Sequence, residues 1–255
     1  MWPTEDAEWR RFAAASGDAG VSVRGSVKAG LKAVVTGAAR GIGAAIAATL
    51  VERGVDVVKI DLLEGGDHQL DVARDPLPDL SDVDVCVSNA AITNTIAPAH
   101  HMTAEQWQRD IDVNLTGAFR VVQACLGGMR ERRFGRVIVI SSGAARAGLP
   151  GQVAYAASKA GLIGMVKTIA AENAGRGITA NAVLPGMVET EAVRAMPSEV
   201  LERVKEALPS GRMATPEEVA ALVAFLASEQ SGYVTGEEIG IDGGFGLNTL
   251  TLGGE

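Results

Sequence analysis

Residues 36–43 read Thr36-Gly37-Ala38-Ala39-Arg40-Gly41-Ile42-Gly43, between an apolar run, LKAVVT at 31–36, and an alanine-rich segment at 41–53. The run predicts a buried strand and the segment predicts a helix, so the glycines lie in the turn between them. Glycines there let the backbone approach a ligand, and the first N–H groups of the helix offer donors and positive potential to a pyrophosphate. A tight turn of this kind also needs glycine when no ligand binds, so the triplet alone is weak evidence.

An acidic residue further along the chain favours the ligand-binding interpretation. Asp61 follows a second apolar run, VDVVKI at 55–60, and lies 18 positions beyond Gly43. A carboxylate at this place accepts hydrogen bonds from the ribose hydroxyls of adenosine and repels a 2′-phosphate. The sequence therefore predicts dinucleotide binding, with NAD preferred over NADP. Arg40 argues the other way, because a guanidinium beside the turn can pair with the 2′-phosphate of NADP.

Short runs rich in valine and isoleucine alternate with longer helical segments along the rest of the chain. Further strands are expected at VDVCVS (83–88), RVIVIS (136–141) and ITANAVL (178–184), and long helices at 103–131 and 155–174. Unbroken apolar strands are typical of a parallel sheet covered on both faces, and the alternation predicts right-handed βαβ units. We therefore expect an α/β fold, a doubly wound parallel sheet in a single domain over residues 31–255.

Two connections in this sheet are unusually short. A candidate strand at 68–72 begins soon after Asp61, whereas a helical crossover normally takes a dozen or more residues. The link from Val72 to Val83 contains Pro76 and Pro78, so it has room for a single helical turn at most.

Composition limits the class of protein. The 255 residues include 23 Lys and Arg against 31 Asp and Glu, and a net charge of −8 argues against a nucleic-acid partner. No run approaches the roughly 18 apolar residues of a membrane span, and the N-terminus has no signal-peptide pattern. Cys86 and Cys125 lie in apolar runs, as expected for buried free thiols in a reducing cytoplasm. We expect a cytoplasmic protein with no membrane partner.

Residues 1–30 differ from the rest and form an expected N-terminal extension. Trp2 and Trp9 precede a stretch rich in glycine, serine and alanine, and a short helix from Pro3 would place Trp9 and Phe12 on one face. The extension is either a mobile tail or a segment laid over the body or a neighbouring subunit.

Tyr155 and Lys159 lie four positions apart on a predicted helix, hence on one face. An ammonium beside a phenol lowers the pKa of the phenol from about 10 toward the working pH, which suits proton transfer to a ketone or from an alcohol. Ser142 comes 13 residues before Tyr155, and its hydroxyl can hold the reacting oxygen for hydride transfer. An isolated Tyr-x-x-x-Lys pair is commonly an exposed helix face, so this prediction depends on the dinucleotide turn and Ser142.

These motifs resemble the classical short-chain dehydrogenase/reductase (SDR) family over residues 31–246. The matching positions follow the family order: Thr36–Gly43, Asp71-Val72, Asn89-Ala90-Ala91, Asn114, Ser142, Tyr155–Lys159, Pro185-Gly186 with Thr190, and Ile241–Gly244. Within the family the chain looks most like the 3-oxoacyl-[acyl-carrier-protein] reductases. The resemblance implies a Rossmann-like domain, an NAD(P)-dependent oxidoreductase that interconverts a ketone and a secondary alcohol, and a homotetramer in which the long helices pair.

The resemblance also implies roles for individual residues. Tyr155 is the acid/base, Lys159 lowers its pKa, and Ser142, favoured over Ser141 by its spacing, positions the oxygen. Asn114 supports a water that links Lys159 to bulk solvent, although an asparagine in a helix can also face solvent or bond its own backbone. The positions implied to contact the cofactor are Gly37, Arg40, Gly41, Ile42, Gly43, Asp61, Asp71, Val72, Asn89, Ala90, Tyr155, Lys159, Pro185, Gly186, Val188 and Thr190.

Departures from the family leave the substrate open. Ala91 replaces a common glycine, and the short connections remove helical cover beside the adenine side, which weakens the assignment to the carrier-protein reductases. Arg133 and Arg176 match positions that dock the acidic carrier protein, or are ordinary solvated arginines. The alternatives are an NAD-dependent dehydrogenase of a cyclic alcohol, diol or hydroxysteroid, and a catalytically idle NAD-binding scaffold.

The histidines indicate no metal site. His68, His100 and His101 show no spacing typical of metal ligands. His100 and His101 follow the Asn89 segment, and bordering the substrate pocket is one interpretation of them.

Overall fold

The sheet in the computed structural model is parallel throughout. The structure describes residues 30–247, so the expectations for residues 1–29 and for the last residues of the domain lie outside the described part. Within that part, seven strands follow the order β3-β2-β1-β4-β5-β6-β7. They are β1 (Lys32–Thr36), β2 (Asp56–Asp61), β3 (His68–Gln69), β4 (Val85–Ser88), β5 (Gly135–Ile140), β6 (Ile178–Pro185) and β7 (Glu238–Ile241). The doubly wound parallel sheet is confirmed.

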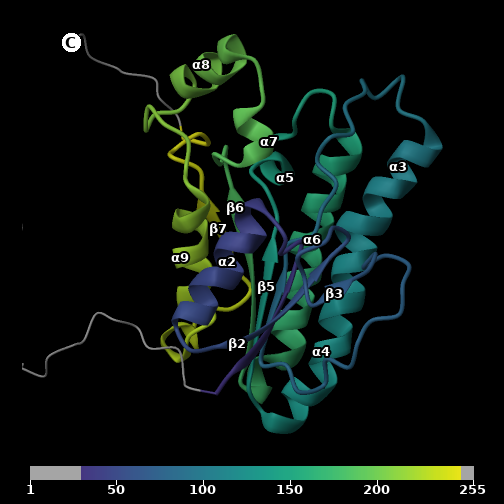
Figure 1. Ribbon diagram of the computed structural model, residues 1–255, viewed down its shortest axis with the longest axis vertical. Coiled ribbons are helices and arrows are strands. Elements are labelled where there is room, and N and C mark those ends of the chain that lie inside the picture. The colour runs from purple at the N-terminus through teal and green to yellow at the C-terminus, as the bar shows by residue number, and fades with distance from the viewer. Residues whose placement is uncertain (1–29, 248–255) are drawn as a thin grey trace, which may run out of the picture.

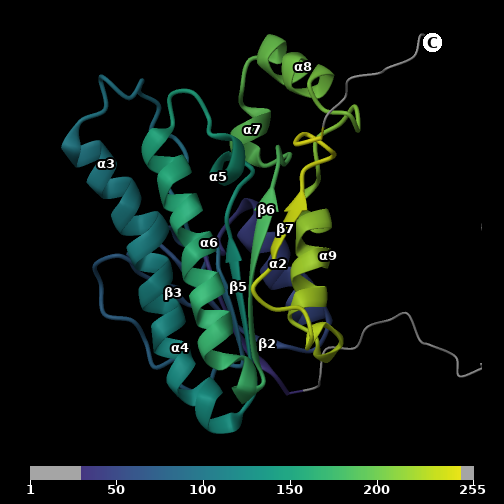
Figure 2. The same ribbon diagram turned by 180° about the vertical axis from the view of Figure 1, so that it is seen from behind.

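Helices cover both faces of this sheet (Figures 1 and 2). One face carries α2 (Gly41–Glu52) and α9 (Pro216–Leu226), and the other carries α4 (Ala118–Arg132) and α6 (Val153–Asn173). α3 (Ala104–Ile111) runs into α4 through a π-helical segment, η1 (Asp112–Gly117). The shorter helices are α5 (Ala144–Ala147), η2 (Ala174–Arg176), α7 (Glu191–Arg194), α8 (Ser198–Glu206) and η3 (Glu229–Ser231).

Each face of the sheet has its own hydrophobic core. Along β1, Val35 packs into the cluster under α2 and α9, while Val34 packs into the cluster under α4 and α6. This alternation follows from the two-residue period of a strand. Cys86 and Cys125 are buried free thiols in the second cluster, as predicted. Among the described residues, no helix has both the length and the hydropathy to cross a membrane.

The two short connections contain no helix, as expected: residues 62–67 and 70–84 form turns and irregular structure. The candidate strand at 68–72 is shorter than predicted, since ladder pairing stops at Gln69. The helical segment predicted at 103–131 is interrupted by η1. Strand β7 and helix α9 were not predicted, although Thr215 and Glu218 form a capping box with Pro216 at the first turn.

Topology brings the sequence motifs to one edge of the sheet. Strand β1 ends beside Gly37 and β4 ends beside Asn89. Strand β5 ends near Ser142 and β6 ends beside Gly186. Successive connections diverge at β1 and β4, which are neighbours in the sheet but not in sequence. Ligands of open α/β sheets bind outside the carboxyl ends of the strands at such a switch point.

Candidate active site

The glycine-rich turn is held by residues far away in sequence. Gly37 has a φ of +66°, and its N–H donates to the carbonyl of Ile60 at 2.8 Å. The amide nitrogen of Asn89 donates to the carbonyls of Thr36 and Gly37 at 3.0 and 3.1 Å. A Cβ on Gly43 would lie 2.0 Å from the carbonyl oxygen of Gly37. These two glycines are therefore required by the turn itself.

The turn also presents the start of α2. Arg40 is the N-cap residue and makes no side-chain capping hydrogen bond, and the first turn of this 12-residue helix holds no acidic residue. Its leading N–H groups therefore lack a side-chain acceptor. An uncapped, positive helix terminus at this edge of the sheet suits a pyrophosphate.

Asp61 ends β2 beside this turn. One carboxylate oxygen accepts from the N–H of Ala39 at 2.8 Å, and the other accepts from the N–H of Leu63 at 2.9 Å. Each oxygen keeps a further lone pair for a ribose hydroxyl. The carboxylate thus fits the adenosine end of a dinucleotide, and Arg40 is exposed on the same turn.

The remaining predicted cofactor positions lie at neighbouring strand ends. The hydroxyl oxygen of Thr36 accepts from the N–H groups of Asn89 and Ala90, both at 3.0 Å. Asp71 accepts from the N–H of Ala73 at 2.9 Å, and Val72 is buried.

The segment after β6 reaches the glycine-rich turn. A Cβ on Gly41 would lie 3.3 Å from the methyl carbon of Thr190, and the hydroxyl of Thr190 caps α7. Gly186 donates to the carbonyl of Ile241, and Val188 is buried. Ile42 packs against the core beneath α2.

Lys159 lies one helical turn from Tyr155 on α6. Its Nζ is 5.7 Å from the centroid of the Tyr155 ring. The ammonium donates to the carbonyl of Ile140, at the end of β5, at 2.7 Å. Burial lowers the pKa of Lys159 to about 8. The lysine therefore titrates much closer to neutral pH than a solvated lysine does.

The pKa of Tyr155 differs from the expectation. Burial of the phenol raises its pKa above the usual value, and a hydrogen bond with Ser142 acts in the opposite direction. The predicted lowering by Lys159 is not found, because the amine is directed to the carbonyl of Ile140 and burial penalises the phenolate. Tyr155 consequently stays protonated at neutral pH.

The two adjacent serines have separate surroundings. Ser141 is buried and donates its hydroxyl to the carbonyl of Lys159 at 2.8 Å. Ser142 is half-buried, accepts from the N–H of Ala144 at 3.1 Å and faces Tyr155. The structure thus pairs Ser142, and not Ser141, with the tyrosine.

Comparison with known proteins finds reductases among the relatives of this chain. A family profile described as enoyl-(acyl carrier protein) reductase matches residues 71–246. An acetoacetyl-CoA reductase of Rhizobium meliloti (strain 1021) is 43% identical over 235 residues, which are 83% of this chain and 97% of the relative. A 3-oxoacyl-[acyl-carrier-protein] reductase of Escherichia coli (strain K12) is 38% identical over 234 residues, 83% of this chain and 96% of the relative.

The chain belongs to the short-chain dehydrogenase/reductase family. It is an NAD(P)-dependent oxidoreductase that interconverts a ketone and a secondary alcohol.

Solved SDR structures share the fold. A 3-oxoacyl-[acyl-carrier protein] reductase from Brucella melitensis ATCC 23457 superposes with a TM-score of 0.78 at 32% identity, covering 86% of this chain and 92% of its own. A protein from Agrobacterium tumefaciens, described provisionally as a gluconate dehydrogenase, has the same TM-score at 29% identity and covers 85% and 96%.

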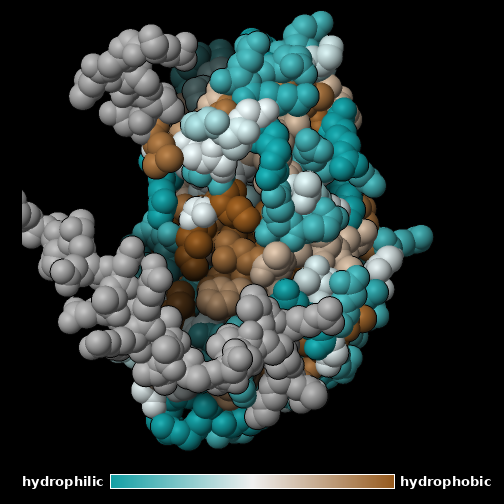
Figure 3. Space-filling model, turned by 90° about the vertical axis from the view of Figure 1, so that its left-hand side faces the viewer, coloured by the Kyte–Doolittle hydropathy of each residue, from teal (hydrophilic) through white to brown (hydrophobic). Residues whose placement is uncertain are grey.

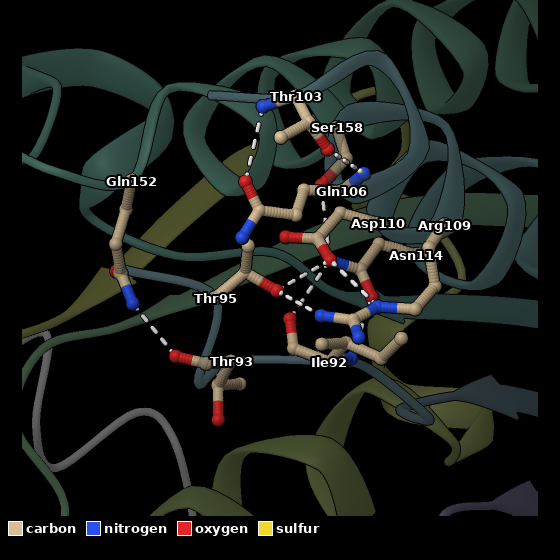
Figure 4. A network of polar contacts seen from close by, with 10 residues as sticks. All are labelled: Ile92, Thr93, Thr95, Thr103, Gln106, Arg109, Asp110, Asn114, Gln152 and Ser158. Carbon is tan, nitrogen blue, oxygen red and sulfur yellow. Dashed lines mark hydrogen bonds and ion pairs between the residues drawn. The ribbon is translucent and has the colours of Figure 1, made fainter. Parts of the chain in front are cut away.

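Asn114 of this SDR chain lies in the π-helical segment η1 (Figure 4). Its amide accepts from the N–H of Ile92 at 2.7 Å and donates to the carbonyl of Ile92 at 3.0 Å. It also donates to the hydroxyl of Ser158 at 3.2 Å, which in turn donates to the carbonyl of Tyr155. The side chain is buried, so the alternative in which it faces solvent is wrong. Its part in a water relay stays a prediction.

Several residues that hold the site were missed by the sequence analysis. Gln152 donates to the carbonyl of Thr93 at 2.6 Å, and Thr95 donates to the buried carboxylate of Asp110 at 2.7 Å (Figure 4). Arg109 completes this cluster by donating to Thr95 at 2.6 Å. One signal in the sequence could have revealed this cluster. Asp110 lies four residues before Asn114 and therefore on the same face of the helix.

An apolar groove lies beside the site. It is formed by the segment at 98–99, by α5 with the loop that follows it, and by one face of α6, and its lining includes Pro98, Ala99, Leu149, Val153, Ala156 and Ala160. His100 and His101 follow directly, with ring centroids 4.2 Å apart, and both are exposed. Neither ring is part of the groove lining, so their role as a substrate border stays a prediction.

Proposed function

We propose that this enzyme reduces 3-oxoacyl thioesters to 3-hydroxyacyl thioesters. The observation that carries the proposal is the hydrogen bond between Tyr155 and Ser142 at the edge of the sheet that also holds the dinucleotide turn. Two hydroxyl donors that meet at one point suit a carbonyl oxygen, which gains negative charge as the carbon is reduced. The acetoacetyl-CoA reductases and 3-oxoacyl-[acyl-carrier-protein] reductases among its relatives support this substrate class.

The chain's own groups then have defined tasks. Ser142 orients the ketone oxygen, and Tyr155 donates its phenolic proton to that oxygen. The nicotinamide cofactor supplies the hydride when bound. Lys159 then passes a proton back to the phenolate that remains, and Asn114 supports the water that resupplies Lys159. A group that protonates the ketone must carry its proton at the start of reduction, and Tyr155 meets this condition at neutral pH.

NAD is the proposed cofactor. Asp61 supports this choice, because its carboxylate is fixed by two N–H groups beside the turn and would repel a 2′-phosphate. Arg40, exposed on the same turn, is the residue that would favour NADP.

We further propose a cytoplasmic homotetramer that acts on a small-molecule substrate, with no nucleic-acid or membrane partner. Trp107 of α3 and Phe119 of α4 are large apolar side chains that are 38% and 44% exposed. Gly164 leaves open space on α6. Hydrophobic residues are also exposed on the side that carries α9 (Figure 3). Apolar surface of this kind marks sites of association.

A second candidate is the oxidation of a polyol or cyclic alcohol. The structural neighbour described provisionally as a gluconate dehydrogenase favours it. The exposed guanidinium of Arg133 donates to the carbonyl of Gly175 at 3.0 Å and keeps further N–H donors, so carrier-protein docking at this position stays a prediction.

A substrate panel tests the proposal. Acetoacetyl-CoA, crotonyl-CoA and a cyclic ketone would be offered with NADH and NADPH, and gluconate and a cyclic diol with NAD⁺ and NADP⁺. We expect the highest kcat/KM for acetoacetyl-CoA with NADH. Crotonyl-CoA, which has a carbon–carbon double bond but no 3-oxo group, is the matched control and should not react. Turnover restricted to gluconate or the diol would overturn the proposal.

A further inference from the structure

The crossover between β3 and β4, residues 70–84, is held by two arginines of α4. Arg132 reaches its end, donating to the carbonyls of Ser81 and Val83, both at 2.7 Å, and to Asp84 at 3.0 Å. Arg120 reaches its start, donating to the carbonyls of Val72 at 2.6 Å and Asp75 at 2.8 Å. Because the crossover has no helix of its own, these charged hydrogen bonds fix its two ends to α4.

The start of the crossover is a tight turn at the carboxyl edge of the sheet. The N–H of Asp75 donates to the carbonyl of Asp71, while the carboxylate of Asp75 accepts from the N–H of Asp71 at 2.7 Å. Just before this turn, Leu70 donates to the carbonyl of Asp61. The turn thus follows a contact with the backbone of Asp61, the residue whose carboxylate is assigned to the adenosine ribose.

Gly117, the last residue of η1, packs against the same turn and limits its movement. A Cβ at Gly117 would lie 2.8 Å from a methyl group of Val72 and 3.5 Å from the nitrogen of Ala73. Val72 therefore has little room to move toward η1, while Arg120 prevents it from moving away. The location of Val72 is therefore fixed by α4 and η1 and not by the sheet, because strand pairing stops at Gln69.

We propose that Arg120 is a positioning residue for the adenine end of the cofactor, acting by holding Asp71 and Val72 in place. This inference rests on the proposed function, a nicotinamide-dependent reductase, and on the cofactor contacts of Asp71 and Val72 that the family resemblance implies. Arg120 touches neither the substrate nor the nicotinamide in this account. Its loss should therefore weaken dinucleotide binding and leave the chemical step intact.

The test compares Arg120→Met with Arg132→Met. Both changes keep an apolar stem and remove charged hydrogen bonds from the same crossover, but only Arg120 lies at the cofactor end. Dissociation constants for NADH would be measured by fluorescence titration, and inhibition constants for ADP-ribose, which lacks the nicotinamide, by competition. Arg120→Met should raise both constants by at least about tenfold, with kcat at saturating cofactor within about twofold of wild type.

Three comparisons with Arg120→Met separate positioning from general damage. Arg132→Met should lower the melting temperature but leave both constants within about twofold of wild type. Gly117→Ala should raise both constants, because the added methyl displaces Val72 although alanine favours the helix. Arg120→Lys, which keeps one donor, should lie between wild type and Arg120→Met.

Three outcomes would overturn the inference. The first is unchanged constants in Arg120→Met, the second is an equal rise in Arg132→Met, and the third is a fall of kcat at saturation as large as the rise in the dissociation constant. If the wild type binds NADH and reduces acetoacetyl-CoA, and Arg120→Met binds NADH as tightly as the wild type does, the inference about Arg120 is refuted and the proposed function stands. A wild type that binds neither NADH nor NADPH refutes the proposed function as well.

Discussion

The ammonium group of Lys159 lies buried beneath the active site, where its hydrogen bond goes to the carbonyl of Ile140. A buried charge loses its hydration, and one neutral acceptor does not replace it fully. The lowered pKa of Lys159 expresses this loss. The lysine is thus a residue that reduces the stability of the fold at neutral pH, and its chemical task accounts for its presence.

The pH dependence of stability should reveal this cost. The folded-state pKa of Lys159 is about 8, below the unfolded value of 10.5, so the unfolded chain binds more protons between these values. Stability contributed by this group therefore rises with pH through that window and is lowest below pH 8. Relative to Lys159→Met, which has no group to titrate, the wild type should gain about 3 kcal/mol between pH 7.5 and 10.5. Denaturant unfolding at several pH values measures the difference, and a constant difference would contradict the assigned burial.

Asp61 should control the choice of cofactor. Asp61→Ala removes the acceptor for the ribose hydroxyls and the repulsion of a 2′-phosphate, while Arg40 remains to pair with that phosphate. Losing a hydrogen bond to a charged group costs about 1.5 to 3 kcal/mol, so the ratio of kcat/KM for NAD over NADP should fall at least about tenfold. The control is Arg40→Ala, which should raise that ratio. A wild type that already prefers NADPH, or an unmoved ratio in Asp61→Ala, would make Arg40 the determinant.

Individual elements differ in how far the sequence reveals them. The strands β1, β4 and β5 were predicted because each contains an unbroken run of apolar residues, and β6 was predicted although Thr179 and Asn181 interrupt its apolar run. Strand β7 was missed, since its four residues, EIGI, include a glycine and no run longer than one apolar residue. The π-helical segment η1 was not predicted. Its Asn114 is hydrogen-bonded to Ile92, a loop residue 22 positions away, and such a contact leaves no periodic pattern in the local sequence.

Two adjacent glycines in α4 provide a matched test of packing at the element scale. A Cβ on Gly128 would lie 1.7 Å from the carbonyl oxygen of Ser81, whereas a Cβ on Gly127 meets nothing within 4 Å. Gly127→Ala should therefore stabilise the chain by up to about 1 kcal/mol through helix propensity. Gly128→Ala should destabilise it by about 1 to 3 kcal/mol, because the crossover must move. Urea unfolding gives both values, and equal effects would show that the crossover does not contact α4 as described.

The whole molecule assembles its site from segments that are distant in sequence. The proposed catalytic trio could be put forward from the sequence because Ser142, Tyr155 and Lys159 are close in the chain and chemically distinctive. The contacts that hold the site were not, because they join residues such as Asn89 and Thr36, 53 positions apart. The direction of the pKa shift of Tyr155 was also beyond the sequence, since it depends on burial by several elements.

Assembly into a tetramer is the prediction for the quaternary scale. The exposed Trp107 and Phe119 lie on the helices that would pair between subunits. Light scattering at micromolar concentration should give about four times the chain mass of 26.3 kDa. Phe119→Glu should reduce that mass by placing a charge in the interface. A monomer mass for the wild type would contradict the prediction.

In the proposed reaction, Tyr155 protonates the ketone oxygen of a 3-oxoacyl thioester during reduction by a nicotinamide cofactor. The most direct measurement follows the oxidation of NADH and NADPH with acetoacetyl-CoA, for wild type and Tyr155→Phe side by side, with cofactor affinity measured for both. We expect turnover by the wild type, a loss of about 10²-fold or more in the variant, and cofactor dissociation constants within about twofold of each other. A variant within about threefold of wild type, or a wild type that consumes neither cofactor with this substrate, would contradict it.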